Sequence, residues 1–229
     1  MKNIINTKPA EDLHGRILFT TAFIDDPDFK NKDILDVGCG YGWFELNILN
    51  KNCHKITGIE ISENDLKTAK DNINNDNVKF EIGSAIQLPF YDNTFDTVVS
   101  WEVIEHIPKN TEYQMFFEIN RVLKNNGVFY ISTPLDNLSK IFDPAWWLIG
   151  HRHYKKDNLI KFAKINGFKV EKIVLTGGLW EILGMNNMYI AKWLFRRAPF
   201  FKNFFNEKLD GEYKKEDGFV NIFIKFRKI

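Results

Sequence analysis

A glycine-rich stretch, residues 32–49 with the sequence KDILDVGCGYGWFELNIL, constrains the fold of this chain more than any other segment. Its first part is a short apolar run typical of a strand buried on both faces, and its last part, from Trp43, has the pattern of a helix. Between them lie three glycines, Gly38, Gly40 and Gly42. Glycine permits positive φ and lets a ligand approach main-chain N–H groups. We therefore expect a polar ligand where the strand ends, beside the Asp36 carboxylate and the start of the helix.

The spacing of these glycines distinguishes between two kinds of nucleotide-like ligand. A dinucleotide fingerprint, GxGxxG, that begins at Gly38 needs a third glycine at position 43, and this chain has Trp43 there. The string DVGCGYG instead resembles the first motif of class I S-adenosylmethionine-dependent methyltransferases. The resemblance implies S-adenosyl-L-methionine as cofactor; a structural turn in another doubly wound fold is the alternative. The loop residues that would contact the cofactor are Asp36, Gly38, Cys39, Gly40 and Tyr41.

A second apolar run, residues 55–59, ends in a further candidate contact, Glu60. A carboxylate at the end of the second strand, roughly 20 residues past the glycines, can accept hydrogen bonds from both ribose hydroxyls. This chemistry is shared by dinucleotide and S-adenosylmethionine sites. If Glu60 binds the ribose, the neighbouring Ile61 would pack against the adenine ring.

The ends of the third and fourth predicted strands add three residues to the candidate cofactor site. Ser84 and Ala85 follow the third strand, at a turn where methyltransferases of this class usually carry Asp. A serine hydroxyl can still accept a hydrogen bond from the adenine amino group, although this bond is uncharged and weaker. Trp101 comes at the end of the fourth strand, at the carboxyl edge where the methionine part of the cofactor should lie.

The resemblance covers residues 32–134 and implies a complete fold. Within this range, LPF at 88–90, Phe-Asp at 95–96 and the turn at 125–127 follow one another as in the family. We expect an α/β fold with a Rossmann-like, doubly wound, seven-stranded sheet, mostly parallel with an antiparallel last strand. The alternating segments 169–175 and 219–226 would be the last two strands, paired antiparallel at the sheet edge.

Composition places the chain among globular proteins with one domain. Its 229 residues are 44% hydrophobic and 27% charged, which suits a single domain, 1–229, with a large core. The formal net charge is +1, so no global field favours nucleic acid as a partner. Neither a signal sequence nor a long apolar run is found, and the two cysteines lack zinc-site spacing, so we expect a cytoplasmic protein with reduced thiols.

An N-terminal helical cap, about residues 1–30, is expected to cover the ligand crevice from outside. Residues 11–24 have the pattern of a helix that ends before two aspartates and a proline. In related methyltransferases an aromatic residue or arginine of this helix often reaches the methionine end of the cofactor. His14 and Arg16 are the candidates here, and an exposed helix face is the simpler interpretation.

The stretch WEVIEHIP, just past the fourth strand, contains the candidate catalytic residue, His106. A helical turn after Glu102 would bring Glu102, Glu105 and His106 to one face, with His151 and His153 about 45 residues later. Such a group could hold Mg²⁺ or a similar hard cation against vicinal hydroxyls, which resembles metal-assisted O-methyltransferases that act on catechols and RNA 3′ ends. The favoured alternative needs no divalent metal, and His106 then orients the cofactor or serves as general base.

A hydrophobic insertion, about residues 177–218, separates the last two strands. It interleaves Trp and Phe residues with Lys and Arg, which suits peripheral contact with a membrane, a lid over an apolar acceptor, helices packed on their own sheet, or a homodimer interface. The predicted function is methyl transfer, with O-methylation of a small-molecule, glycan or lipid-linked acceptor favoured. An inactive methyltransferase-fold binding module and a nucleotide-dependent oxidoreductase are the alternatives.

Overall fold

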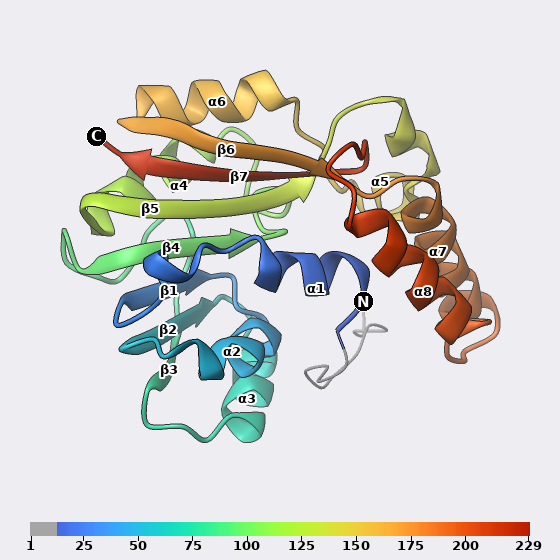
Figure 1. Cartoon of the computed structure of the whole chain (residues 1–229), viewed down its shortest axis with the longest axis horizontal. Helices are drawn as coiled ribbons and strands as arrows, with labels where there is room; N and C mark the ends of the chain where they lie inside the picture. The colour runs from blue at the N-terminus through green and yellow to red at the C-terminus, as the bar shows by residue number, and fades with distance from the viewer. Residues whose placement is uncertain (1–12) are drawn as a thin grey trace.

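One seven-stranded sheet organises the protein, for which the computed structural model describes residues 13–229 (Figure 1). The strands are β1 (Asp33–Val37), β2 (Lys55–Glu60), β3 (Val78–Ile82), β4 (Phe95–Trp101), β5 (Leu123–Pro134), β6 (Phe168–Thr176) and β7 (Asn221–Lys228). Their order across the sheet is β3-β2-β1-β4-β5-β7-β6. The first five are parallel, whereas β7 pairs antiparallel with both β5 and β6. The predicted doubly wound sheet with an antiparallel last strand is confirmed.

Eight α-helices and four shorter helical segments connect the strands within residues 13–229. The α-helices are α1 (Gly15–Ala22), α2 (Trp43–Ile48), α3 (Glu63–Asn72), α4 (Glu112–Val122), α5 (Pro144–Ile149), α6 (Lys156–Ile165), α7 (Leu179–Tyr189) and α8 (Lys202–Tyr213). The shorter segments are η1 (Asp26–Asp28), η2 (Leu49–Lys51), η3 (Leu138–Phe142) and η4 (Ile190–Leu194), of which η4 is a π-helical continuation of α7. The first part of the predicted cap, residues 1–12, lies outside the described residues.

Two apolar layers bury the sheet. On one face, α4 and α6 pack against β4, β5 and β7, with Phe116, Phe129 and Phe226 in contact at the centre. On the other face, α1 and α2 pack against β1, β5 and β7 around Tyr130 and Phe223. Each strand alternates its side chains between the faces, so a parallel sheet covered on both sides is apolar on both. This burial fixes the strand ends at which a ligand could bind.

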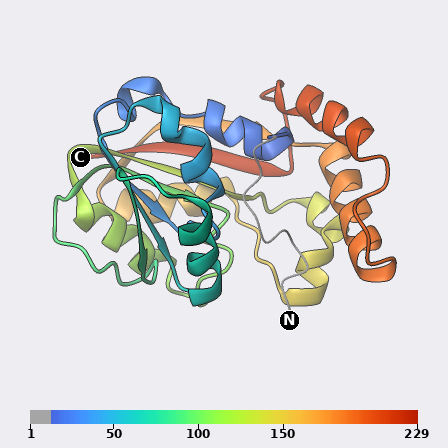
Figure 2. The same cartoon turned by 90° about the horizontal axis from the view of Figure 1, so that it is seen from below.

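The helices of the predicted insertion lie beyond the end of the sheet toward which the arrows of β4 and β5 point, together with α5 (Figures 1 and 2). Helix α8 is attached to the N-terminal helix, because the Gly15 N–H donates to the Asp210 carboxylate at 2.7 Å. Tyr213, at the end of α8, is buried in the core cluster. The second half of the insertion therefore packs on α1 and the sheet.

Several predicted boundaries differ from the structure, most of all those of the first helix and of β5. The first helix begins at Gly15 instead of at residue 11, because the chain before it is extended at His14. Strand β5 begins at Leu123, so residues 125–127, which were predicted as a turn, lie within it. The side chain of Lys228 binds the Leu123 carbonyl at 2.7 Å, and Arg227 binds the carbonyl of Asn126, so contacts from β7 hold this early part of β5.

Candidate functional site

The three glycines after β1 all have positive φ, but the space around each of them differs. A Cβ on Gly38 would lie 2.4 Å from a methyl carbon of Val103, and one on Gly42 would lie 2.8 Å from the Ile73 side chain. These two glycines are therefore required by close packing inside the protein. A Cβ on Gly40, where φ is +54°, would meet no described atom within 4 Å. Of the three, only Gly40 leaves open space above the loop where a ligand could approach.

The carboxylate of Glu60 at the end of β2 is held beside this open space. Its Oε2 accepts a hydrogen bond from the Gly40 N–H at 3.1 Å, and its Oε1 accepts from the N–H groups of Ile61 and Ser62. The Ile61 side chain next to it is 72% exposed. The structure thus brings together the glycine loop, the predicted ribose-binding carboxylate and the apolar side chain predicted to meet the adenine.

The other predicted cofactor residues surround this point with different degrees of burial. The Cys39 side chain is buried under the loop against Gly58, so only its main chain could face a ligand. Tyr41 is half-buried, and burial raises the pKa of its hydroxyl. Ser84 and Ala85 are half-buried at the end of β3, where a hydrogen bond from Gly83 to the Glu60 carbonyl places them beside β2.

Trp101 belongs to the core at the end of β4. Its side chain packs against Phe44, Tyr130 and Phe223, and the residue is only 6% exposed. Its indole N–H has no hydrogen-bond partner among residues 13–229. The ring therefore packs between α2, β5 and β7, and a direct contact with a ligand stays a prediction.

A buried pair of carboxyl groups, which the sequence reading missed, lies beneath the glycine loop. Asp36 on β1 is 2% exposed, and Glu45 on α2 is fully buried. Burial, together with the charge of the neighbouring Glu45, raises the pKa of Asp36 well above its usual value. Burial also raises the pKa of Glu45 to about 7. The sequence gives one hint of this pair, because Glu45 is an acidic residue in the first turn of a helix. Exposed helices often carry an acidic residue at this position too.

Replacing Glu45 by glutamine is expected to flatten the pH dependence of stability. The folded-state pKa of Glu45 lies near 7 and the unfolded value near 4.5, so the native state alone holds the proton between these values. The free energy of unfolding therefore falls as pH rises from about 4.5 to about 7, by up to roughly 3 kcal/mol at about 1.4 kcal/mol per pKa unit. Glutamine cannot ionise, so urea unfolding of Glu45→Gln should lose much of this decline.

The matched control for this measurement is Glu63→Gln, because Glu63 is an exposed glutamate at the start of α3. Its substitution should leave the change in stability between pH 5 and pH 8 as in the parent protein. If the pH dependence of stability were unchanged in Glu45→Gln, Glu45 would not be the group that keeps its proton in the native state. A loss of folding at both pH values would show that Glu45 is needed for packing instead.

The end of β4 is joined to the N-terminal helix by an ion pair. The Arg16 guanidinium lies 2.5 Å from the Glu102 carboxylate, which also accepts a hydrogen bond from Ser132 at 2.6 Å. Burial lowers the pKa of Arg16, but the charges of Glu102 and of Glu181 on α7 outweigh it and hold the pKa above its usual range. Arg16 thus lies between β4 and α7, and a contact with the methionine end of a cofactor stays a prediction.

The predicted helical turn after Glu102 is wrong. Glu102 has a φ of +57°, and residues 103–110 form turns instead of a helix. The guanidinium of Arg152 determines this shape, because it donates to the main-chain carbonyls of Ile104, Glu105 and Ile107. With its carbonyls bound in this way, the loop makes one main-chain turn, from the His106 N–H to the Val103 carbonyl, and no helix; Glu102 pairs with Arg16.

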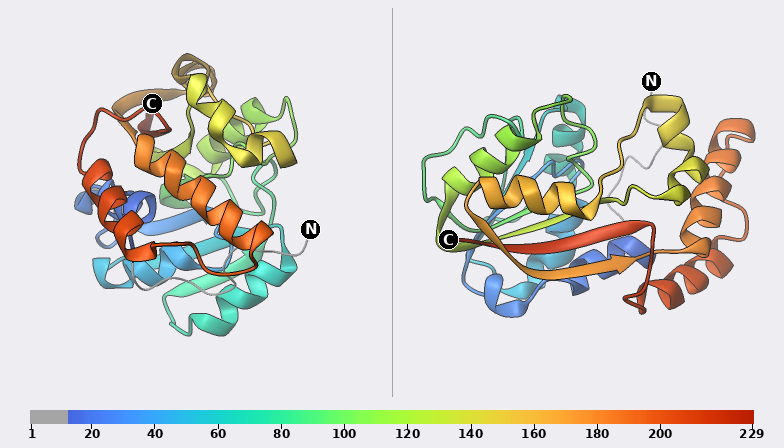
Figure 3. Two further views of the ribbon diagram at one scale, coloured as in Figure 1. Left: turned by 90° about the vertical axis from the view of Figure 1, so that its right-hand side faces the viewer. Right: turned by 90° about the horizontal axis from the view of Figure 1, so that it is seen from above.

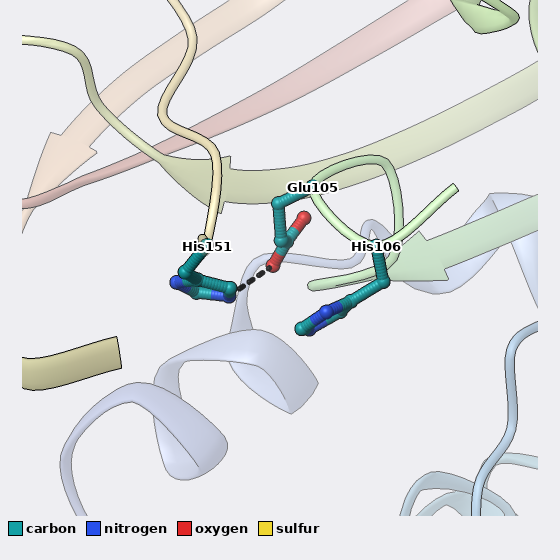
Figure 4. Close-up of side chains that lie close together, drawn as sticks. All are labelled: Glu105, His106 and His151. Carbon is teal, nitrogen blue, oxygen red and sulfur yellow. Dashed lines mark ion pairs between the residues drawn. The ribbon is translucent and has the colours of Figure 1, made fainter. Parts of the chain in front are cut away.

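Glu105, His106 and His151 nevertheless come together beyond the end of β4 (Figure 4). The rings of His106 and His151 lie 4.8 Å apart, and Nε2 of His151 is 3.7 Å from Glu105 Oε1. His153 lies in an adjoining group, where it and His151 both contact Oδ2 of Asp143, at 2.9 and 3.2 Å. Sequence reasoning missed Asp143, because no pattern connects it to histidines that lie outside its helix.

The electrostatics of this group favour neutral imidazole at His106. Burial and the neighbouring His151 lower the pKa of His106 to about 4. Burial and the charge of Glu102 raise the pKa of Glu105, and its Oε1 has no hydrogen-bond partner among the described residues. Burial raises the pKa of Asp143, but hydrogen bonds from His151 and His153 outweigh it and leave the pKa below its usual value. A neutral imidazole at this edge can accept a proton.

Donor atoms for a metal ion are also within reach of one another here. In the group Glu105, His106 and His151, and in the group Asp143, His151 and His153, the ligand-type atoms lie within 4.8 Å of each other. Glu102 belongs to neither group, so the predicted set of two carboxylates with His106 is not assembled. Two imidazoles with one carboxylate suit a borderline cation better than Mg²⁺, which prefers oxygen ligands.

Among residues 13–229, no helix combines the length and apolar character needed to cross a bilayer.

Comparison with known proteins places the glycine loop and the β4 edge within one family of domains. A family model described as a methyltransferase domain matches residues 35–131. The norajmaline N-methyltransferase of Rauvolfia serpentina is 33% identical over 93 residues, which are 39% of this chain and 32% of that protein.

Two further comparisons cover more of the chain. The ubiquinone biosynthesis O-methyltransferase of Pelagibacter ubique is 26% identical over 169 residues, 73% of this chain and 65% of that protein. The crystal structure of an S-adenosylmethionine-dependent methyltransferase from Mesorhizobium loti superposes with a TM-score of 0.63 at 16% identity, covering 91% of this chain and 95% of that one. The chain therefore spans about a third of the first curated relatives that it matches, and nearly all of this solved fold.

Proposed function

We propose that this chain, whose residues 35–131 match a methyltransferase domain, is a class I S-adenosylmethionine-dependent methyltransferase that transfers a methyl group to a hydroxyl oxygen of an acceptor with an apolar portion. The observation that carries the proposal is the open space above Gly40, next to a carboxylate fixed on the Gly40 N–H. A ligand with a ribose and a flat apolar base fits these groups. Glu60 would accept from the ribose hydroxyls, and Ile61 would lie against the base.

For methyl transfer, the protein mainly has to align the acceptor atom with the methyl group. The sulfonium of S-adenosylmethionine supplies an activated methyl group, so the enzyme holds the acceptor oxygen in line with it and excludes water. A hydroxyl acceptor must also lose a proton. We assign this step to His106, whose neutral imidazole lies just past β4, on the same sheet edge as the glycine loop. His151 lies beside it, and Asp143 holds His151 in place.

Two observations support an apolar portion in the acceptor. Helix α7 lies beyond the end of the sheet toward which the arrow of β4 points, and its Asn186 side chain donates to the carbonyl of Phe142, the residue before Asp143. His106 lies past the same end of β4. The side chains of α7 are mainly apolar, and the neighbouring α5 also exposes apolar residues. One relative is named as an O-methyltransferase of ubiquinone biosynthesis, a further reason to favour oxygen as the methylated atom.

The test has two stages. First, S-adenosylhomocysteine and NAD are compared by thermal shift, because a ligand that binds only the native state raises the melting temperature. We expect stabilisation by S-adenosylhomocysteine alone; stabilisation by NAD alone would favour the oxidoreductase. Second, transfer from radiolabelled S-adenosylmethionine is measured with phenols and sugars, each with and without an alkyl chain. Binding without transfer to any of them would favour the inactive binding module.

A further inference from the structure

One end of the molecule exposes an unusual number of large apolar side chains. They belong to η3, to α5 and to the segment that joins α7 to α8. Leu138 is 85% exposed, Trp147 67%, Leu194 74% and Phe201 79%. Scattered exposed apolar residues are ordinary, but a concentration at one end of a fold marks an interaction surface. We call this set, with Phe142 and Phe195, the apolar end.

The two parts of the apolar end are held together. The Asn186 side chain on α7 donates to the Phe142 carbonyl of η3 at 2.9 Å. Asn187 binds both the N–H and the carbonyl of Phe200, which fixes the segment after η4 on the side of α7. Figure 3 shows α7 crossing this end of the molecule, with α5 on one side and α8 on the other. The exposed side chains therefore stand on an ordered frame.

The charges of the same segment are all of one sign. Residues 182–206 contain no Asp or Glu, and their charged residues are Lys192, Arg196, Arg197 and Lys202. The whole chain, in contrast, balances 31 basic against 30 acidic residues. Arg197 lies 4.5 Å from the centre of the Phe200 ring, so cations and aromatic rings are interleaved at the surface. Such a surface complements an apolar layer that carries negative charge at its boundary.

We infer that the apolar end docks on the surface of an anionic phospholipid bilayer. Aromatic and aliphatic side chains would enter the interface, while Arg196 and Lys202 meet lipid phosphates. A second copy of the chain fits less well, because a two-fold interface brings the same patch of both subunits together and would oppose two cationic surfaces. The helices described are too short or too polar to span a bilayer, so the contact is peripheral.

The placement gives this surface a role in the proposed reaction, and this step rests on the proposed function. Helix α7 joins the apolar end to the edge that holds Arg16 and His106, so docking brings that edge close to the bilayer. An acceptor with an apolar tail could then present its hydroxyl to His106 while the tail stays in lipid. Membrane binding itself needs no methyl transfer and can be measured separately.

The experiment is co-sedimentation with vesicles of phosphatidylcholine alone and of phosphatidylcholine with phosphatidylglycerol. We expect binding to the anionic vesicles that weakens with salt. Arg196→Glu with Lys202→Glu should lower the partition coefficient at least about tenfold, and Leu194→Ser with Phe201→Ser should lower it at any salt concentration. The matched controls are Lys161→Glu with Lys164→Glu on α6, which make the same charge change elsewhere, and Tyr91→Ser with Ile165→Ser, which remove apolar side chains that are 90% and 61% exposed.

Every variant is checked for folding by its melting temperature and for an intact cofactor site by S-adenosylhomocysteine affinity, which should stay within about twofold. Equal sedimentation of the parent protein and of both apolar-end variants would overturn the inference. So would light scattering that shows a dimer dissociated by Leu194→Ser with Phe201→Ser, because a second copy would then cover this surface. Vesicle binding without any methyl transfer would leave the docking surface standing and overturn the proposed function alone.

Discussion

Gly40→Ala is expected to weaken S-adenosylhomocysteine binding by at least about thirtyfold, as measured by calorimetry. The added Cβ meets no described protein atom within 4 Å, so it projects into the space that the proposed cofactor would occupy. It would separate the ligand from the main-chain N–H groups of the loop. Loss of one or two hydrogen bonds to a polar ligand corresponds to roughly one to two powers of ten in affinity.

Gly150→Ala provides a closely matched control. Gly150 ends α5 with a φ of +71°, and a Cβ there also meets nothing described within 4 Å. Both substitutions place alanine in the left-handed region and should cost a similar stability, about 1 kcal/mol. Only Gly40→Ala should lose affinity. If both variants bind S-adenosylhomocysteine like the parent, the cofactor site does not use the glycine loop.

Patterns of neighbouring residues in the sequence predicted those parts of the fold that short-range interactions determine. Strand β3 runs from Val78 to Ile82, where apolar and charged residues alternate as is typical of a strand. The hydroxyl of Ser62, just before α3, accepts from the Asp65 N–H, which is the usual bond of a serine that caps a helix. These features follow from neighbours in the sequence, and the resemblance to the family supplied the expectation of a seven-stranded, mostly parallel sheet.

Long-range contacts explain what sequence reasoning missed. The turn after Glu102 is shaped by Arg152, some 45 residues away, and Glu102 is paired with Arg16, 86 positions earlier. No periodicity reports such contacts, so a helical turn was the natural expectation from the spacing alone. The buried Glu45 escaped notice for a similar reason, since its partner Asp36 lies on a different element.

The insertion was interpreted as one unit, but its two halves have different surroundings. The Asp210 carboxylate binds the N–H of Gly15, and Glu212 accepts from the N–H groups of Trp180 and Glu181. Helix α8 therefore connects α1 with the start of α7. Removing residues 178–216 as a block would expose the face of α1, so point substitutions on the exposed segment test the role of the insertion more cleanly.

His106→Gln is expected to lower kcat for a hydroxyl acceptor by about 100-fold or more, which is the usual contribution of a positioned general base. Glutamine keeps a similar length and polarity but cannot take up the proton. The affinity for S-adenosylhomocysteine should change little, because the cofactor contacts proposed here lie at Gly40 and Glu60 and not at His106. Stopped-assay rates at saturating S-adenosylmethionine, compared with binding by calorimetry, separate the two effects.

His54→Gln is the control, because His54 is an exposed histidine that pairs with Asp33 at the opposite end of the sheet. The same rates are measured after treatment with EDTA and after readdition of Mn²⁺ or Mg²⁺. A base needs no cation, so the parent should keep its activity in EDTA. If EDTA abolishes transfer and a metal restores it, the group of Glu105, His106 and His151 acts by binding that cation, and the loss in His106→Gln is then the loss of a ligand and not of a base.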